Sequence, residues 1–126
     1  MMELAEIHPG MRVIDLGSGA GRLLFLAAEK GAVAIGYELN PFLVWWTRLV
    51  ASLKKATVVV EQRSLYQADL HEADVVFAFL FPKPMKKLAP KLFQELKPGA
   101  RIISYVFSIP GQTPIAKQEG IYVYRV

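Results

Sequence analysis

Cysteine is absent from the 126 residues of this sequence. Its absence excludes disulfide bonds and cysteine-ligated metal sites. It also fits a reducing compartment, so we expect a cytoplasmic protein. Histidine is scarce as well, and neither His8 nor His71 has carboxylates or a second histidine at the spacing of metal ligands. We therefore expect no metal cofactor.

Long apolar runs are also missing. The most apolar stretch, residues 41–53, carries Arg48 and falls short of the ~20 apolar residues of a membrane-spanning helix. Near the start of the chain, Glu3, Glu6 and His8 interrupt any signal-peptide pattern. These absences predict a soluble protein without a membrane span.

The charge is modest and only slightly unbalanced. The net charge is +4, and 53% of the residues are hydrophobic, which is typical of a folded globular chain. A length of 126 residues suits one domain covering 1–126. A run of lysines indicates either a solvated helix face or a docking surface for an acidic partner or nucleic acid. These lysines are Lys83, Lys86, Lys87, Lys91 and Lys97.

Strand and helix signals alternate along the chain. Apolar and β-branched runs predict strands at residues 11–15, 32–37, 57–61, 74–80 and 100–107, and a hairpin from 113–118 and 121–126. Helical spacing predicts helices at 21–30, 41–53 and 84–96, the last one kinked or broken at Pro90. Residues 62–73 leave room only for a stub of a helix. The alternation predicts an α/β protein with a parallel sheet covered on both faces.

The most informative segment is VIDLGSGAGR, residues 13–22. An apolar strand ends at Asp15, and a loop with three glycines then leads into a helix. Such a loop lets the backbone approach a nucleotide or a similar polar ligand closely, with the N–H groups of the helix N-terminus facing it. A dinucleotide fingerprint would need glycine at position 22, where this chain has Arg22. The spacing therefore disfavours a nicotinamide cofactor.

A second acid supports a nucleotide site. Glu38 follows the second predicted strand at close to the interval after Asp15 at which nucleotide-binding proteins place an acid against ribose hydroxyls. One carboxylate can accept hydrogen bonds from two hydroxyls. Leu39 is expected against one face of the adenine, and Asn40 is expected to cap the following helix. The alternative for Glu38 is a surface glutamate in a turn.

The glycine loop resembles motif I of the Rossmann-like methyltransferases that use S-adenosylmethionine (AdoMet). Three longer segments, GYELNPFLVWW, ADVVFAFLFPKPM and KLFQELKPGARIISYVFSIPG, are similar to the protein-lysine methyltransferases that modify the ATP synthase c subunit and related proteins. The resemblance covers most of the chain. It implies a three-layer α/β/α sandwich with a mostly parallel seven-stranded sheet in the order 3-2-1-4-5-7-6. The terminal hairpin would supply the antiparallel strand.

The resemblance also implies the cofactor and its site. AdoMet is the expected cofactor. Ala20 and Ser64 depart from the family pattern, which tends to have acids there. A plain turn serine is the alternative for Ser64. The expected cofactor-binding residues are Asp15, Gly17, Ser18, Gly19, Gly21, Glu38, Leu39, Ser64 and Leu65.

Aromatic residues follow the fourth predicted strand, where the methyl group should be presented. We predict that Phe79, Phe81 and Pro82 form the catalytic end of the site, as the wall of a dry channel facing a sulfonium or an amine. The alternative is simple core packing. Trp45 and Trp46 are neighbours on a predicted helix, so one of them is expected at the surface or at an interface.

The sequence therefore predicts a methyltransferase that transfers a methyl group from AdoMet to a protein lysine. Alternatives are an RNA or small-molecule methyltransferase, or a non-catalytic AdoMet-binding module; nucleic acid is not excluded as a partner. Methyltransferases of this fold normally have helices before motif I, whereas only residues 1–10 precede the first strand here. We expect either no such cap, or a homodimer or other partner that covers the open face.

Overall fold

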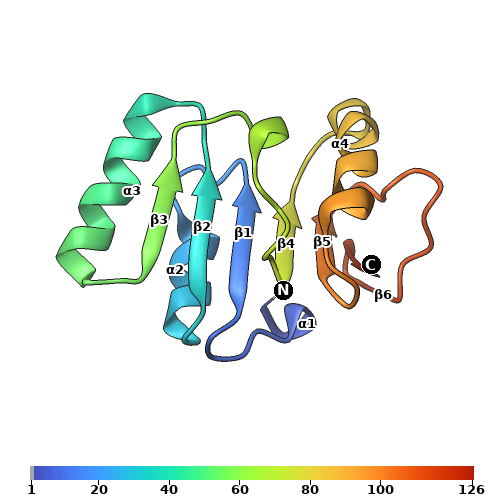
Figure 1. Ribbon diagram of the computed structural model, residues 1–126, viewed down its shortest axis with the longest axis horizontal. Helices are drawn as coiled ribbons and strands as arrows, with labels where there is room; N and C mark the ends of the chain where they lie inside the picture. Colours follow the sequence, from blue (N-terminus) through green and yellow to red (C-terminus); the bar gives the residue numbers. More distant parts are fainter. Residues whose placement is uncertain (1) are drawn as a thin grey trace.

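A single seven-stranded sheet organises the computed structural model, which describes residues 2–126 (Figure 1). The strand order is β3-β2-β1-β4-β5-β7-β6, which confirms the predicted order. Strands β1 to β5 pair in parallel, while β7 is antiparallel to both β5 and β6, so the hairpin supplies the antiparallel strand as expected. The strands are β1 Arg12–Leu16, β2 Val33–Tyr37, β3 Val58–Glu61, β4 Val75–Ala78, β5 Arg101–Tyr105, β6 Ala116–Gln118 and β7 Ile121–Arg125.

The helices agree with the predicted periodicity, with two differences. The described helices are α1 Met2–Ala5, α2 Arg22–Glu29, α3 Pro41–Lys54, the short 3₁₀ helix η1 Leu65–Gln67 and α4 Pro82–Glu95. The short α1 was not predicted. Helix α4 starts two residues earlier than expected and continues through Pro90, so a break at Pro90 is wrong. Pro90 is exposed, and the carbonyl of Lys86 that it cannot bond also belongs to an exposed residue, so water can satisfy it.

Local chemistry explains where α3 begins. The Asn40 side chain accepts hydrogen bonds from the backbone N–H groups of Phe42, at 2.9 Å, and Leu43, at 3.4 Å. Pro41 occupies the first helical position, where its missing N–H costs nothing. The predicted capping role of Asn40 is confirmed, and it fixes the direction in which the chain leaves β2.

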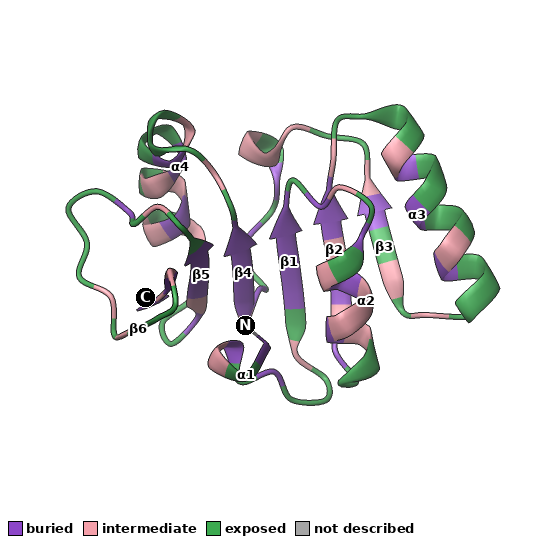
Figure 2. Cartoon of the chain, turned by 180° about the vertical axis from the view of Figure 1, so that it is seen from behind, coloured by how far each residue is buried: buried purple, intermediate pink, exposed green. Residues whose placement is uncertain are grey.

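The core lies on both faces of the sheet. On one face α2 packs through Leu24 and Ala27, and α1 covers the lower part through Met2 and Ala5. On the other face α4 packs through Met85, Leu88 and Leu92. Figure 2 shows α2 in front of β2, with buried residues along β1, β4 and β5.

The predicted stub between β3 and β4 is confirmed as η1. Because no longer helix forms there, the face of β3 that points away from α2 is open in Figure 1, and Val59 is 53% exposed. Among residues 2–126, no helix has the length and apolar character needed to cross a bilayer.

Candidate active site

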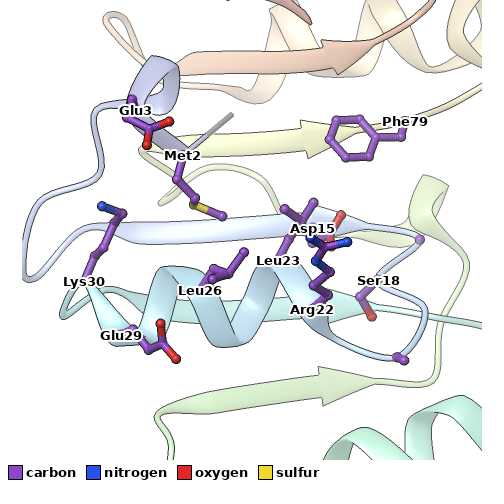
Figure 3. A pocket seen from close by; sticks show the side chains of 12 residues that line it. Met2, Glu3, Asp15, Ser18, Arg22, Leu23, Leu26, Glu29, Lys30 and Phe79 are labelled. Carbon is purple, nitrogen blue, oxygen red and sulfur yellow. The ribbon is translucent and has the colours of Figure 1, made fainter.

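A large pocket of about 880 Å³ extends along α2 from the carboxyl end of β1 to α1 (Figure 3). Asp15, Ser18 and Arg22 line it from β1 and the following loop and helix, and Phe79 lines it from the segment after β4 (Figure 3). Met2 and Glu3 of α1 close its far side. One end of the pocket therefore lies where parallel α/β sheets bind ligands, next to the point where the strand order reverses.

A second, smaller pocket of about 180 Å³ lies on the other side of the glycine loop. Gly17 lines both pockets, so the backbone of the loop separates them. The smaller pocket is lined by Gly17, Tyr37, Glu38, Leu39, Arg63, Ser64, Leu65 and Tyr66. Four of the predicted cofactor-binding residues after the glycine loop are thus brought together.

Backbone hydrogen bonds tie the glycine loop to the end of β2. The N–H groups of Gly17 and Ser18 donate to the Tyr37 carbonyl at 2.8 and 3.2 Å. Those two donors hold the loop in place. The N–H groups that can face a ligand are therefore those of residues 22–24, in the first turn of α2, because they have no acceptor within the helix.

Close packing at two positions requires glycine. At Gly21, the left-handed cap of α2, a Cβ atom would lie 2.7 Å from Cγ2 of Thr47. At Gly36, in the middle of β2, a Cβ atom would lie 2.7 Å from Oγ of Ser18 and 2.6 Å from Cδ1 of Leu24. Gly36 lets the loop and α2 lie directly on the sheet, a role that was not predicted from the sequence.

Asp15 is the buried acid of the site. It ends β1 with 4% of its surface exposed and faces the large pocket. Burial, helped by the negative charge of Glu38, raises the pKa of Asp15 from 3.8 to about 7. A buried acid in this state is stabilised as a carboxylate by a cation or a hydrogen-bond donor in the pocket.

Glu38 is held in a fixed orientation by the backbone. Its Oε1 accepts the Gly19 N–H at 2.8 Å, and its Oε2 accepts the Asn40 N–H at 2.9 Å. Each oxygen keeps a further lone pair for a ligand hydroxyl. Gly19 thus contributes by holding the Glu38 carboxylate in place. Two backbone hydrogen bonds to one carboxylate distinguish Glu38 from the free surface glutamate of the alternative.

The other residues of the small pocket include a serine that caps η1 and two leucines. The Ser64 hydroxyl accepts the Tyr66 N–H at 3.3 Å and caps η1, the plain turn role left open by the sequence. Leu39 is 63% exposed and Leu65 is partly buried. Arg63 and Tyr66 also line this pocket and were missed, although they flank the predicted pair in sequence.

The predicted catalytic end is only partly assembled. Phe79 lines the large pocket, and its ring lies 6.1 Å from that of Phe77 and 5.9 Å from that of Tyr105. Phe81 is 71% exposed and packs against Phe107, while Pro82 starts α4, and neither lines the large pocket. The catalytic roles of all three stay predictions, and Phe79 is the best placed.

One cluster has the donor types of a metal site. The ligand atoms of Asp69, His71 and Glu95 lie within 4.8 Å of one another. Asp69 and His71 are exposed and paired at 2.9 Å, and Glu95 is bonded to Lys91 at 2.5 Å. These hydrogen bonds account for the cluster, and it lines neither pocket.

The residues present fit AdoMet. The cofactor carries a sulfonium and an ammonium group, which suit the buried Asp15. The Ser18 hydroxyl is buried without a partner among the described residues and can bond the same polar end. Glu38 suits the ribose hydroxyls, and the apolar Leu39 and Leu65 suit the adenine.

The sheet order and this two-sided site define the Rossmann-like class of AdoMet-dependent methyltransferases. Residues 15–116 match the model of the ANTKMT methyltransferase domain. The chain belongs to this family, which confirms the expected resemblance, class of enzyme and cofactor.

Relatives and solved structures agree. The chain is 38% identical over 119 residues to mouse adenine nucleotide translocase lysine N-methyltransferase, covering 92% of this chain and 52% of the mouse protein. It is 35% identical to the protein-lysine N-methyltransferase of Saccharolobus islandicus, covering 100% of this chain and 86% of that protein. The crystal structure of an RNA methyltransferase from Salinibacter ruber in complex with S-adenosyl-L-homocysteine has a TM-score of 0.89 and 37% identity. The match covers 98% of this chain and 84% of that structure. The chain spans about half the length of the mouse relative.

Proposed function

We propose that the protein transfers a methyl group from AdoMet to the side-chain amine of a lysine in another protein. The observation that carries this proposal is the match to the ANTKMT methyltransferase domain over residues 15–116. Its support from the geometry is the large pocket, where a buried acid and an aromatic ring share one space. Relatives that match nearly the whole chain are named as lysine N-methyltransferases.

When bound, AdoMet supplies an electrophilic methyl group on a sulfonium. A neutral lysine Nζ would take up this methyl group through its lone pair, and the electrons of the S–C bond would remain on sulfur. The lysine must first release a proton to solvent, and an apolar approach lowers its pKa.

The chain's own residues bind and align the reactants. Glu38, fixed by the Gly19 and Asn40 N–H groups, orients the ribose, and Asp15 balances the positive charge. Phe79 excludes water from one wall of the pocket. Alignment and water exclusion account for catalysis without a dedicated base.

RNA is the second candidate acceptor. One solved structure with 37% identity is described as an RNA methyltransferase, and Lys83, Lys86 and Lys87 are exposed at the start of α4. These lysines lie next to the predicted catalytic end and could pair with phosphates. A protein acceptor is favoured because two relatives are named for lysine methylation.

Labelled AdoMet distinguishes the two acceptors. The protein is incubated with methyl-labelled AdoMet and a cell lysate, and the products are divided between protease and nuclease digestion. The proposal expects protease-sensitive label that co-migrates with methyllysine after acid hydrolysis. Label released only by nuclease would replace it with RNA methylation, and no label in either fraction would favour a binding module. The cytoplasmic setting stays a prediction that cell fractionation tests.

A further inference from the structure

Helix α3 carries its large apolar side chains on the outside. The α3 stripe is Phe42, Trp45, Trp46, Leu49 and Leu53, which are 67%, 57%, 45%, 37% and 76% exposed. The residues that α3 buries against the sheet are the smaller Val44, Thr47 and Ala51. This is the reverse of an ordinary surface helix, whose outer face is polar. In Figure 2 the outer side of α3 is the exposed edge of the molecule beyond β3.

The spacing makes the stripe continuous. Its residues recur at intervals of three and four, so they share one side of the helix over about 17 Å. The rings of Phe42 and Trp45 already pack at 6.0 Å. A contiguous exposed patch of this kind marks an interaction surface in a soluble protein.

The stripe is also uncharged. No acid occurs in residues 41–55. The Arg48 guanidinium donates to the Val60 carbonyl at 2.8 and 3.2 Å, and the Lys54 ammonium lies 5.1 Å from the centre of the Phe25 ring. These two cations therefore turn back onto their own chain, and the third, the exposed Lys55, follows the last turn of α3 as its C-cap. The surface suits an apolar protein partner and offers little to anionic lipid or nucleic acid.

The area of the stripe matches what two copies need. With about 150–250 Å² for a whole aromatic side chain, the exposed parts of the stripe amount to roughly 500–700 Å² per copy. Two stripes together bury roughly 1,000–1,400 Å², which reaches the lower range of specific interfaces near 1,200 Å². Tryptophan at the centre of such a patch is the residue type that dominates interface energies.

We propose that the α3 stripe is the interface of a homodimer, in which α3 packs antiparallel against α3 of a second copy. A two-fold axis between Trp46 and Leu49 brings Phe42 of each copy to Leu53 of the other. The helix dipoles then run in opposite directions, which is favourable. This inference does not depend on the identity of the methyl acceptor.

Molecular mass in solution tests the dimer. Sedimentation or light scattering is run from about 1 µM to about 1 mM. This range covers the dissociation constants expected for a dimer with an interface of this size. Wild type should approach twice the 14.1 kDa of one chain, and Trp45→Glu should stay at one chain mass. Ile115→Glu, which places the same charge at an equally exposed apolar residue away from α3, should dimerise as wild type does. A wild-type protein that stays monomeric throughout would overturn the proposal.

Tryptophan fluorescence locates the interface. Both tryptophans of the chain lie in the stripe, so acrylamide quenching should weaken several-fold as wild type is concentrated. Leu53→Glu keeps both tryptophans and should remove this concentration dependence, with an unchanged melting profile as the check on folding. A dimer that survives both stripe variants would overturn the assignment. Binding of a monomer to phosphatidylserine vesicles through the stripe would also overturn it.

Discussion

Asp15 and Glu38 lie at the ends of adjacent parallel strands, and the negative charge of Glu38 adds to burial in raising the pKa of Asp15 to about 7. Burial and the charge of Glu38 make the Asp15 carboxylate unfavourable, and a cation that enters the large pocket makes it favourable. The buried acid that destabilises the site is therefore also the group that we propose binds the positive end of AdoMet. The buried Asp15 carboxylate should therefore lower the free energy of unfolding and raise the affinity for AdoMet, and both effects can be measured.

Asp15→Asn should stabilise the protein above neutral pH. The unfolded pKa is near 3.8 and the folded pKa about 7, so the folded state favours the protonated acid. The contribution of the protonated acid is fully present below pH 3.8 and is lost as pH rises through 7. Because asparagine does not ionise, the stability advantage of the variant should grow by about 2–4 kcal/mol between pH 4 and pH 8. Urea unfolding across this range measures it.

Asp74→Asn is the matched control with the opposite sign. Desolvation acts to raise the pKa of Asp74, but the Arg12 N–H and the Lys97 ammonium outweigh it and lower the net pKa. Its stabilising effect is present above pH 3.8 and lost as pH falls through the lowered folded value. The variant should therefore be the less stable protein at neutral pH. If Asp15→Asn behaved in the same way, the account of Asp15 would be wrong.

AdoMet affinity should fall as pH drops below about 7. A cationic ligand favours the Asp15 carboxylate, so binding to the protonated form must first release a proton. The decrease should approach a limit of about tenfold per pH unit. Calorimetry in two buffers of different ionisation enthalpy would also show proton release near pH 6. If the affinity for AdoMet stayed unchanged from pH 8 to pH 5.5, Asp15 would not be part of the binding site.

Gly36→Ala should weaken both the fold and the cofactor site. The added methyl group would lie 2.7 Å from the Ser18 hydroxyl and 2.6 Å from Leu24, so the loop and α2 must shift. Overpacking of this kind costs about 1–3 kcal/mol. Thermal melting and AdoMet titration follow the two effects. Unchanged stability with unchanged binding would show that the loop does not need this close contact.

Phe79→Ala should lower kcat about tenfold while changing AdoMet affinity much less, because the ring forms a wall of the pocket and excludes water. Phe81→Ala is the comparison variant, since Phe81 is more exposed and lines neither pocket. Its effect on kcat should be smaller. Steady-state kinetics with an unmethylated protein acceptor measures both. Equal losses would restore Phe81 to the catalytic end.

Most of the fold could be predicted because each local signal was strong and consistent. The Asn40 cap, Pro41 and the β-branched strands all identify their elements within a few neighbouring residues. Right-handed crossovers then limit the strand order. The prediction of a break at Pro90 was wrong because Leu88 and Leu92 hold helix α4 in the core. This tertiary packing outweighs one missing hydrogen bond.

The arrangement of the site could be predicted where its residues lie at the ends of strands. Asp15 lies near the end of β1, and the glycine loop and Glu38 directly follow β1 and β2, so the sheet brings them together. Phe79 directly follows β4 and keeps its ring beside that of Phe77, whereas Phe81 is the N-cap of α4, where strand alternation no longer applies. Met2 and Tyr66 reach the pockets through tertiary packing that no local pattern encodes.

Glu38→Gln is the substitution that reaches the centre of the account. The amide keeps the size of the side chain but loses the charge that accepts from the Gly19 and Asn40 N–H groups and from the ribose. A hydrogen bond to a charged group contributes about 1.5–3 kcal/mol, so affinity should fall roughly 10- to 100-fold. Glu72→Gln, an exposed acid that lines neither cofactor pocket, is the control for the loss of charge alone.

The most direct measurement is calorimetric titration of AdoMet into wild type, Glu38→Gln and Glu72→Gln at pH 8. We predict one site per chain in wild type, the same affinity in Glu72→Gln, and the 10- to 100-fold loss in Glu38→Gln. No heat of binding in wild type, or equal affinity in all three proteins, would contradict an AdoMet site at this edge of the sheet.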